Sequence, residues 1–212
     1  MSILSITLCR DRIAIATKVI GKASYSRANG ISQSLKKGHI FESGDTLKTA
    51  KGGFVALLFI DDKTALKVKE NSEVVISGKR SAQAIAKDIS LNGGIIRAQV
   101  DKQKKGDFIV RTSVSVASVK GTDFWLLSNQ TGDTLIGLEG VVSFSSLISG
   151  KSIDIVSGNS GLSTPEGSIQ SLKTDPKTIP QDQSDTDSGP QKLDIELKDA
   201  SGKKKTLIIE YN

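Results

Sequence analysis

The chain is poor in the residues that most often carry catalysis. Among its 212 residues it has one cysteine, Cys9, which excludes an internal disulfide framework and a zinc site built from cysteines. His39 is the only histidine, and it stands in a segment that we expect to be a loop. Acid–base and nucleophilic catalysis usually depend on a tuned histidine, paired carboxylates or an activated nucleophile. We therefore expect no enzyme activity.

Ligands for a metal or a cofactor are equally scarce. Asp45 and the pair Asp61-Asp62 could bind a cation, but adjacent carboxylates at a strand end are ordinarily turn residues, and calcium loops space their oxygen ligands more regularly. The glycine-rich stretches lack the Gly-Lys-Thr arrangement of a phosphate-binding loop, so they are expected to be turns. The sequence predicts neither a metal site nor a cofactor.

Aromatic residues make up 4% of the chain, whereas its net charge is +6. An excess of positive charge favours anionic partners such as nucleic acid, acidic polysaccharide or phospholipid headgroups. Nucleic-acid binding needs basic residues interleaved with exposed aromatics, and the two basic clusters, 101–107 and 201–206, contain none. We expect no nucleic-acid partner, and keep peptidoglycan or acidic polysaccharide as candidate ligands.

Long hydrophobic runs are absent as well. No stretch approaches the ~20 apolar residues that a membrane-spanning helix needs, so no transmembrane segment is expected. A short apolar run, residues 3–8, precedes Cys9. It is interpreted either as an ordinary first strand or as the remnant of an export or lipoprotein signal, in which case Cys9 would carry lipid. Residues 1–16 are assigned to this N-terminal segment.

Proline is missing from the first 164 residues, and all four prolines lie between positions 165 and 190. The segment 157–190 is also rich in Ser, Thr, Gly, Asp and Gln, a composition that buries too little apolar area to offset the entropy of ordering it. We predict a flexible linker there. Beyond it, residues 191–212 alternate apolar and polar side chains around Ser201-Gly202, which predicts a β-hairpin able to add to a partner's sheet.

Short segments of strand character fill the chain between residues 17 and 156. A continuous apolar run at 54–60 predicts a strand buried on both faces, and alternating segments predict strands with one wet face at 65–70, 85–91, 94–100, 107–116 and 133–139. Helical periodicity is not evident. The sequence therefore predicts one all-β domain over 17–156, an irregular β-solenoid-like fold or a distorted β-sandwich of many short strands.

The order and spacing of several motifs resemble the FecR-like domain, a periplasmic module of bacterial iron-dicitrate signalling regulators and other envelope proteins. The resemblance covers roughly residues 17–145 and rests on segments such as "ESGDTLKTAKGGFVALLFIDD" (42–62), "FIVRTSVSVASVKGTDFWL" (108–126) and "TLIGLEGVVSF" (134–144). The positions that carry it are expected to be structural: Gly44, Asp45, Thr49, Gly121, Thr122, Phe124, Glu139 and Gly140.

The motif around Gly121 predicts a specific local structure. Glycine permits a backbone conformation closed to residues with a Cβ, so the chain can turn sharply there between two strands. Thr122 could hold the turn by a local hydrogen bond, and Phe124 or Trp125 would seal the core next to it.

The resemblance implies a function without catalysis. We expect a binding or scaffolding module of the bacterial cell envelope, periplasmic or lipid-anchored, that contacts protein or glycan partners. The alternative is a sensor module of iron-dicitrate-type transmembrane signalling, which regulates a sigma factor but lacks its own membrane helix.

Overall fold

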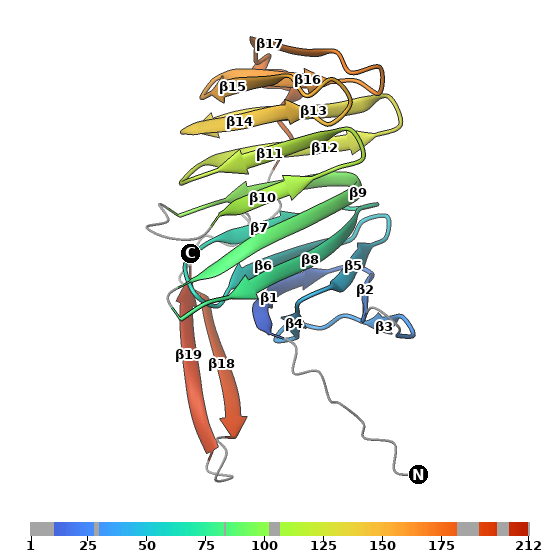
Figure 1. Ribbon diagram of the computed structural model, residues 1–212. Helices are drawn as coiled ribbons and strands as arrows, with labels where there is room; N and C mark the ends of the chain where they lie inside the picture. Colours follow the sequence, from blue (N-terminus) through green and yellow to red (C-terminus); the bar gives the residue numbers. More distant parts are fainter. Residues whose placement is uncertain are drawn as a thin grey trace, which may run out of the picture.

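The computed structural model describes residues 11–27, 30–82, 84–101, 107–181, 191–198 and 204–211. Within these ranges every regular element is a strand, except for the short 3-10 helix η1 (Pro176–Thr178). Two sheets face each other and form an elongated stack that begins with the N-terminal strands and ends with the strands of residues 152–173 (Figure 1). The predicted all-β fold of many short strands is confirmed.

Both sheets are largely antiparallel, and both run the length of the stack. Sheet A contains, in spatial order, β4 (Ile40–Glu42), β1 (Arg12–Ile20), β6 (Phe54–Phe59), β7 (Ala65–Val68), β9 (Ile85–Gln99), β12 (Asp123–Asn129), β13 (Gly132–Glu139), β16 (Asn159–Ser163) and β17 (Ile169–Lys173). Sheet B contains β3 (Gln33–Ser34), β2 (Ala23–Ser26), β5 (Asp45–Thr49), β8 (Glu73–Arg80), β9 again, β10 (Phe108–Arg111), β11 (Ser115–Val119), β14 (Val141–Ser146) and β15 (Ser152–Val156).

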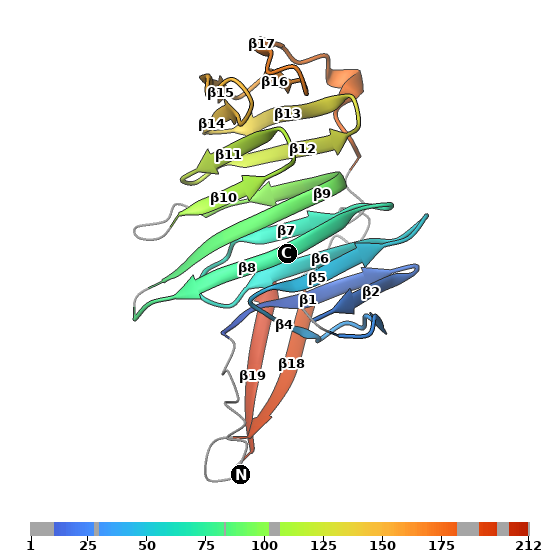
Figure 2. The ribbon, with the colours of Figure 1, turned by 45° about the vertical axis from the view of Figure 1, so that its right-hand side comes forward.

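Strand β9 belongs to both sheets, which the sequence did not predict. Its first part pairs with β8 and β10 in sheet B, and its last part, from Gly94 onward, pairs with β7 and β12 in sheet A. The change of sheet occurs at Gly93 and Gly94, whose φ angles are 148° and 107°. The segments 85–91 and 94–100, predicted as two strands, are thus one bent strand that diagonally crosses the stack in Figure 2.

The core lies between the two sheets and follows the alternation of the sequence. In β8, for example, Val74 and Ile76 are fully buried, while Val75 between them is half-buried. All six phenylalanines of the chain have no exposed surface. Burying one such side chain contributes about 1.5–3 kcal/mol, so these few aromatic residues supply a large share of the stability.

The interpretation of 157–190 as a flexible linker is wrong for its described part. Residues 159–163 and 169–173 form β16 and β17, which extend sheet A beyond β13. Small residues are needed here, because a Cβ on Gly161 would lie 2.7 Å from Phe144 and 2.9 Å from Ile155. The serine- and glycine-rich composition suggested disorder, but here it belongs to a strand that packs closely against the core. Residues 182–190 lie outside the described residues.

The C-terminal hairpin is present and forms a sheet of its own. Strand β18 (Gln191–Lys198) pairs antiparallel with β19 (Lys204–Tyr211), with Leu193 opposite Ile209 and Ile195 opposite Leu207. At the other terminus, strand β1 begins at Arg12, five residues before the predicted start of the domain, whereas the predicted first strand at residues 3–8 lies outside the described residues. Among the described residues there is no helix with the length and apolar character of a membrane span.

Candidate functional site

The family-motif positions lie at two separate places in the stack, and most of them shape turns. Gly121 and Gly140 both have a φ of 77°, and they stand side by side in the turns before β12 and before β14. A Cβ on Gly140 would lie 2.8 Å from the Gly121 carbonyl oxygen and 2.9 Å from Thr122 Cγ2. Glu139 is exposed beside them and pairs with Asp123 at a β-bulge.

The Gly121 turn is held by backbone rather than by side chain. The amide of Thr122 donates to the Val100 carbonyl at 3.0 Å, and the amide of Val100 donates back to the Thr122 carbonyl at 2.8 Å. The buried Thr122 hydroxyl has no hydrogen-bond partner among the described residues, so the local bond predicted for it is not formed. The turn itself and the burial of Phe124 are as expected.

Trp125 is buried, but not in the core between the sheets. Phe124 and Leu126 belong to that core, whereas Trp125 points from β12 to the opposite face of sheet A and is still only 1% exposed. Two cations border its ring, Lys69 at 5.9 Å and Arg97 at 5.7 Å from the centroid. Lys69 also donates to the carbonyl of Gln181 at 2.9 Å, which brings the segment after β17 back to this part of the sheet.

The second group of motif positions surrounds β5. Gly44, with a φ of 91°, turns the chain into this strand, and the fully buried Asp45 accepts a hydrogen bond from the Glu42 amide at 2.9 Å. At the end of the strand, the Thr49 hydroxyl donates to the Lys69 carbonyl and accepts from the Ser72 amide. These groups fasten the ends of β5, which is a structural role.

Asp61 and Asp62 do bind a cation, and it is a side chain of this chain. Lys87 is fully buried on β9, and its ammonium lies 3.0 Å from Asp61 Oδ2 and 2.7 Å from Asp62 Oδ2. The sequence contained a signal that we missed: Lys87 shares its position in the alternation with Ile85 and Ile89, so it had to face inward. No group of three or more metal-ligating side chains occurs among the described residues.

His39 is part of an aromatic cluster. Its ring centroid lies 3.7 Å from that of Tyr25 and 4.9 Å from that of Phe41. Partial burial lowers the pKa of His39 below its usual range, and the charge of Arg27 adds to this effect, while Asp45 and Glu42 oppose it. The neutral imidazole that results serves packing.

Another polar cluster lies at Asp133, on β13. Its Oδ2 atom accepts hydrogen bonds from the hydroxyls of Thr112 and Ser115, and all three groups are buried or half-buried. Thr112 also caps the turn between β10 and β11, since its hydroxyl accepts from the amides of Val114 and Ser115. This cluster connects the turn between β10 and β11, in sheet B, to β13 in sheet A.

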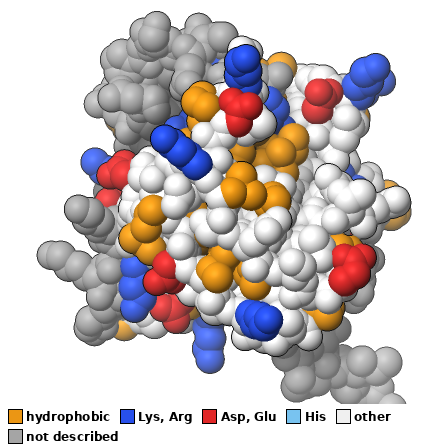
Figure 3. Space-filling model, turned by 90° about the horizontal axis from the view of Figure 1, so that it is seen from above, with side chains coloured by type: hydrophobic (Ala, Val, Ile, Leu, Met, Phe, Trp, Pro, Cys, Tyr) orange, Lys and Arg blue, Asp and Glu red, His pale blue; other side chains and the backbone are white. Residues whose placement is uncertain are grey.

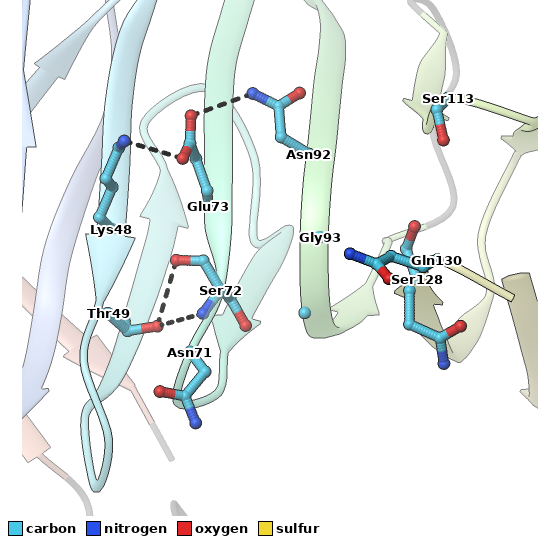
Figure 4. Close-up of a pocket in the computed structure, with 12 residues that line it drawn as sticks. Lys48, Thr49, Asn71, Ser72, Glu73, Asn92, Gly93, Ser113, Ser128 and Gln130 are labelled. Atoms are coloured by element: carbon cyan, nitrogen blue, oxygen red, sulfur yellow. Dashed lines mark hydrogen bonds and ion pairs between the residues drawn. The ribbon is translucent and has the colours of Figure 1, made fainter. Parts of the chain in front are cut away.

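A hollow opens where β9 changes sheet. It has a volume of about 570 Å³ and is lined by the end of β5, the turn into β8, the bend of β9, and the turns that follow β10 and β12. Figure 4 shows two walls with Gly93 between them. We call this hollow the sheet-switch groove; Thr49 is the one motif position on its rim.

One wall of the sheet-switch groove is a row of polar side chains across three strands. Lys48 Nζ lies 2.8 Å from Glu73 Oε2, and Asn92 Nδ2 donates to Glu73 Oε1 at 3.2 Å. These two hydrogen bonds lower the pKa of the Glu73 carboxyl below its usual range. The opposite wall consists of Ser113, Ser128, Asn129 and Gln130.

Comparison with known proteins agrees with the fold. The family model described as "FecR protein" matches residues 45–143, so the predicted FecR-like domain is confirmed. Two crystal structures of a "putative anti-sigma factor" from Parabacteroides distasonis, at 2.50 and 1.65 Å resolution, are similar in fold, with TM-scores of 0.53 and 0.52 at 14% and 16% sequence identity. Each alignment covers 61% of this chain and 60% of the other chain. No curated protein matches.

Proposed function

We propose that this chain is a non-enzymatic binding module of the bacterial cell envelope, and that it acts in signalling through contact with another protein. The match to the FecR family supports the signalling role, as does the fold shared with the Parabacteroides distasonis structures. The buried polar groups of the described residues support a role without catalysis, because Lys87, His39 and Asp133 are each engaged in packing or in holding turns.

The observation that carries this proposal is the open end of the stack at β15 and β17. Each of these strands has a single strand partner among the described residues, β14 and β16 respectively, so the outer backbone groups of both are available. Ile148 and Leu172 are 56% and 43% exposed there, and apolar side chains gather in the middle of this face (Figure 3). A stack of strands usually needs a polar cap at its ends to remain monomeric.

A partner that suits this end is a protein segment in extended conformation. An added strand would pair with the free edge of β17, and its apolar side chains would cover Leu172 and Ile148. The hairpin of residues 191–212 remains a second candidate for strand addition, in this case to the sheet of a partner.

Site-specific crosslinking in cells tests the contact. A photoreactive residue at position 172 should yield a discrete adduct with an envelope protein. The same residue at position 31 is the matched control, because Ile31 is also apolar and 87% exposed but lies beside β3 at the other end of the stack. Identical adducts from both positions, or none from position 172, would contradict the proposal.

A sensor of the iron-signalling kind is the second candidate, favoured by the anti-sigma description of the fold neighbours. In that case Leu172→Asp should alter transcription from a sigma-factor-dependent reporter, whereas Ile31→Asp should not. The match to the FecR family supports the proposed envelope location, which would be either periplasmic or lipid-anchored. Mass spectrometry of the native N-terminus decides whether Cys9 carries lipid, and cytosolic fractionation of the chain would count against the proposed location.

A further inference from the structure

The sheet-switch groove exists because the hydrogen-bond ladder of β9 is interrupted. On one side of β9, pairing with β10 ends at Ser90, opposite Arg111, and pairing with β12 begins at Gly94, opposite Ser128. The three residues between them, Leu91 to Gly93, have no strand partner on that side among the described residues. Leu91 and Gly93 still pair with β8 on the other side, and of the three residues Asn92 and Gly93 line the groove, where a ligand can approach their backbone.

Glycine keeps this interruption open. A Cβ on Gly94 would lie 2.2 Å from the Ser72 hydroxyl, so the last part of β9 approaches the turn before β8 more closely than any other residue would allow. At Gly93, by contrast, a Cβ would meet nothing within 4 Å, and the backbone borders open space. The φ of 148° at Gly93 is unfavourable for residues with a side chain. Both the bend of β9 and the groove therefore depend on glycine at this position.

The groove is lined by polar residues and glycines, whose carbon atoms also contribute to its surface. All the residues around it are glycine or carry a hydroxyl, an amide, a carboxylate or an ammonium group. No hydrophobic side chain lines the groove, so a purely apolar ligand would leave the polar groups of these residues without hydrogen-bond partners. A ligand that carries many hydroxyls would instead exchange hydrogen bonds to water for hydrogen bonds to Asn92, Gln130 and the free backbone of β9.

The charges of the groove balance. Lys48 and Glu73 form an ion pair at 2.8 Å, so the wall offers no unpaired cation for a phosphate or a uronic acid. Glu73 is nevertheless held in place by Lys48 and Asn92, and its carboxylate is a strong acceptor for hydroxyl groups. The volume of about 570 Å³ lies within the range of small-ligand sites, about 300–1,000 Å³.

We propose that the sheet-switch groove binds an uncharged oligosaccharide. On one wall Glu73 accepts hydrogen bonds from sugar hydroxyls beside Asn92, and on the other wall Gln130 exchanges hydrogen bonds with them (Figure 4). Asn129, whose Oδ1 atom already accepts from the amide and the hydroxyl of Thr131, adds a donor through its Nδ2 atom. The backbone of Asn92 and Gly93, which has no strand partner on the side of β10 and β12 among the described residues, lies between the two walls. This site is separate from the apolar end of the stack, and the inference does not rest on the proposed protein contact.

Titration of the full chain with neutral and acidic oligosaccharides tests the inference. Chitotetraose and maltotetraose are the neutral probes, tetragalacturonate is the acidic one, and a neutral apolar pentapeptide represents the competing class. Amide chemical shifts locate each ligand. We expect a neutral saccharide to shift the amides of Asn92, Gly93, Gly94 and Gln130, with an affinity that does not change with salt.

Variants separate a built site from a weak surface contact. Asn92→Ala and Glu73→Ala should weaken binding about tenfold or more, because each removes hydrogen bonds to a charged or oriented group. Gln170→Ala is the matched control, since Gln170 is an exposed amide on β17 far from the groove, and it should bind like the original chain. Melting curves confirm that all three variants are folded.

Three results would overturn the inference: no saccharide shifts the groove amides, the pentapeptide or tetragalacturonate binds there in preference to the neutral saccharides, or Gln170→Ala weakens binding as much as Asn92→Ala. None of these results bears on the crosslink from position 172. Conversely, loss of that crosslink leaves the saccharide titration unaffected, so the two proposals fail independently.

Discussion

The ammonium of Lys87 lies 2.7 Å from the Asp62 carboxylate, in a position where the lysine side chain has no exposed surface. Asp61 contributes a second contact at 3.0 Å, and the Phe59 ring lies 5.3 Å from the ammonium. Asp61 and Asp62, a candidate cation site in the sequence, therefore neutralise a buried lysine side chain. The stability of this half of the stack depends on that neutralisation, because an unpaired buried charge is costly.

Replacing both carboxylates, in Asp61→Asn with Asp62→Asn, should lower the free energy of unfolding by about 3–5 kcal/mol, since it leaves the Lys87 charge buried without a counterion. Urea denaturation measures this. Asp88→Asn is the control: it breaks the exposed pair with Arg111, in which both side chains are nearly half exposed, and should cost about 1 kcal/mol or less. Equal midpoints for the double variant and the control would contradict the prediction.

Gly140→Ala should destabilise the protein more than Gly150→Ala. Both glycines have a positive φ, 77° and 69°, which costs an alanine about 1–2 kcal/mol. Only at Gly140 would the new Cβ also press against the Gly121 carbonyl, at 2.8 Å, whereas at Gly150 it meets nothing within 4 Å. We expect losses of about 3 and about 1 kcal/mol, measured by thermal unfolding. Similar losses in both variants would mean that the two turns do not support each other.

Stability should fall with acid through His39. Its pKa is lowered in the folded state, mainly by burial, so between its usual value of about 6.5 and the lowered value the unfolded chain binds more protons than the folded one. The free energy of unfolding therefore decreases as the pH falls through that window and does not depend on His39 above it. In His39→Phe this part of the pH dependence should disappear; an unchanged slope in the variant would refute the assignment.

The fluorescence of Trp125, the only tryptophan, should report on the segment after β17. The ring is buried outside the core, next to Lys69, and Lys69 is bonded to the Gln181 carbonyl. A chain ending after Lys173 should expose the ring and shift its emission to longer wavelength. A chain ending after Gln181 is the control and should keep the emission of the full chain. No shift in the shorter chain would show that other residues cover the tryptophan.

Alternation of apolar and polar residues was sufficient to predict most strands. The buried run at 54–60 became β6, and the segments 65–70 and 133–139 became β7 and β13, because their patterns reflect burial on two faces or on one. The errors occurred where small residues carry the structure. Gly93-Gly94 reads as a turn but is a bend within one strand, and the serines and glycine of 159–163 read as a linker but pack under Phe144.

The sheet-switch groove could not be predicted in the same way. Lys48, Glu73, Asn92 and Gln130 come from four separate segments, and only the strand register brings them to one place. One signal was present, because Asn92-Gly93-Gly94 interrupts an otherwise regular alternation and so marks a special backbone position. The burial of Lys87 was easier to predict, because its place in the alternation of β9 already assigned it to the interior.

Strand β9 determines how the stack would respond to mechanical force. In both sheets it stands between the strands that precede it in the chain and those that follow it. Every ladder connection between the two halves that the described strands form therefore runs through its fifteen residues. Force applied along the stack would concentrate on this one strand. The described part of the stack therefore consists of two groups of strands that are joined through β9.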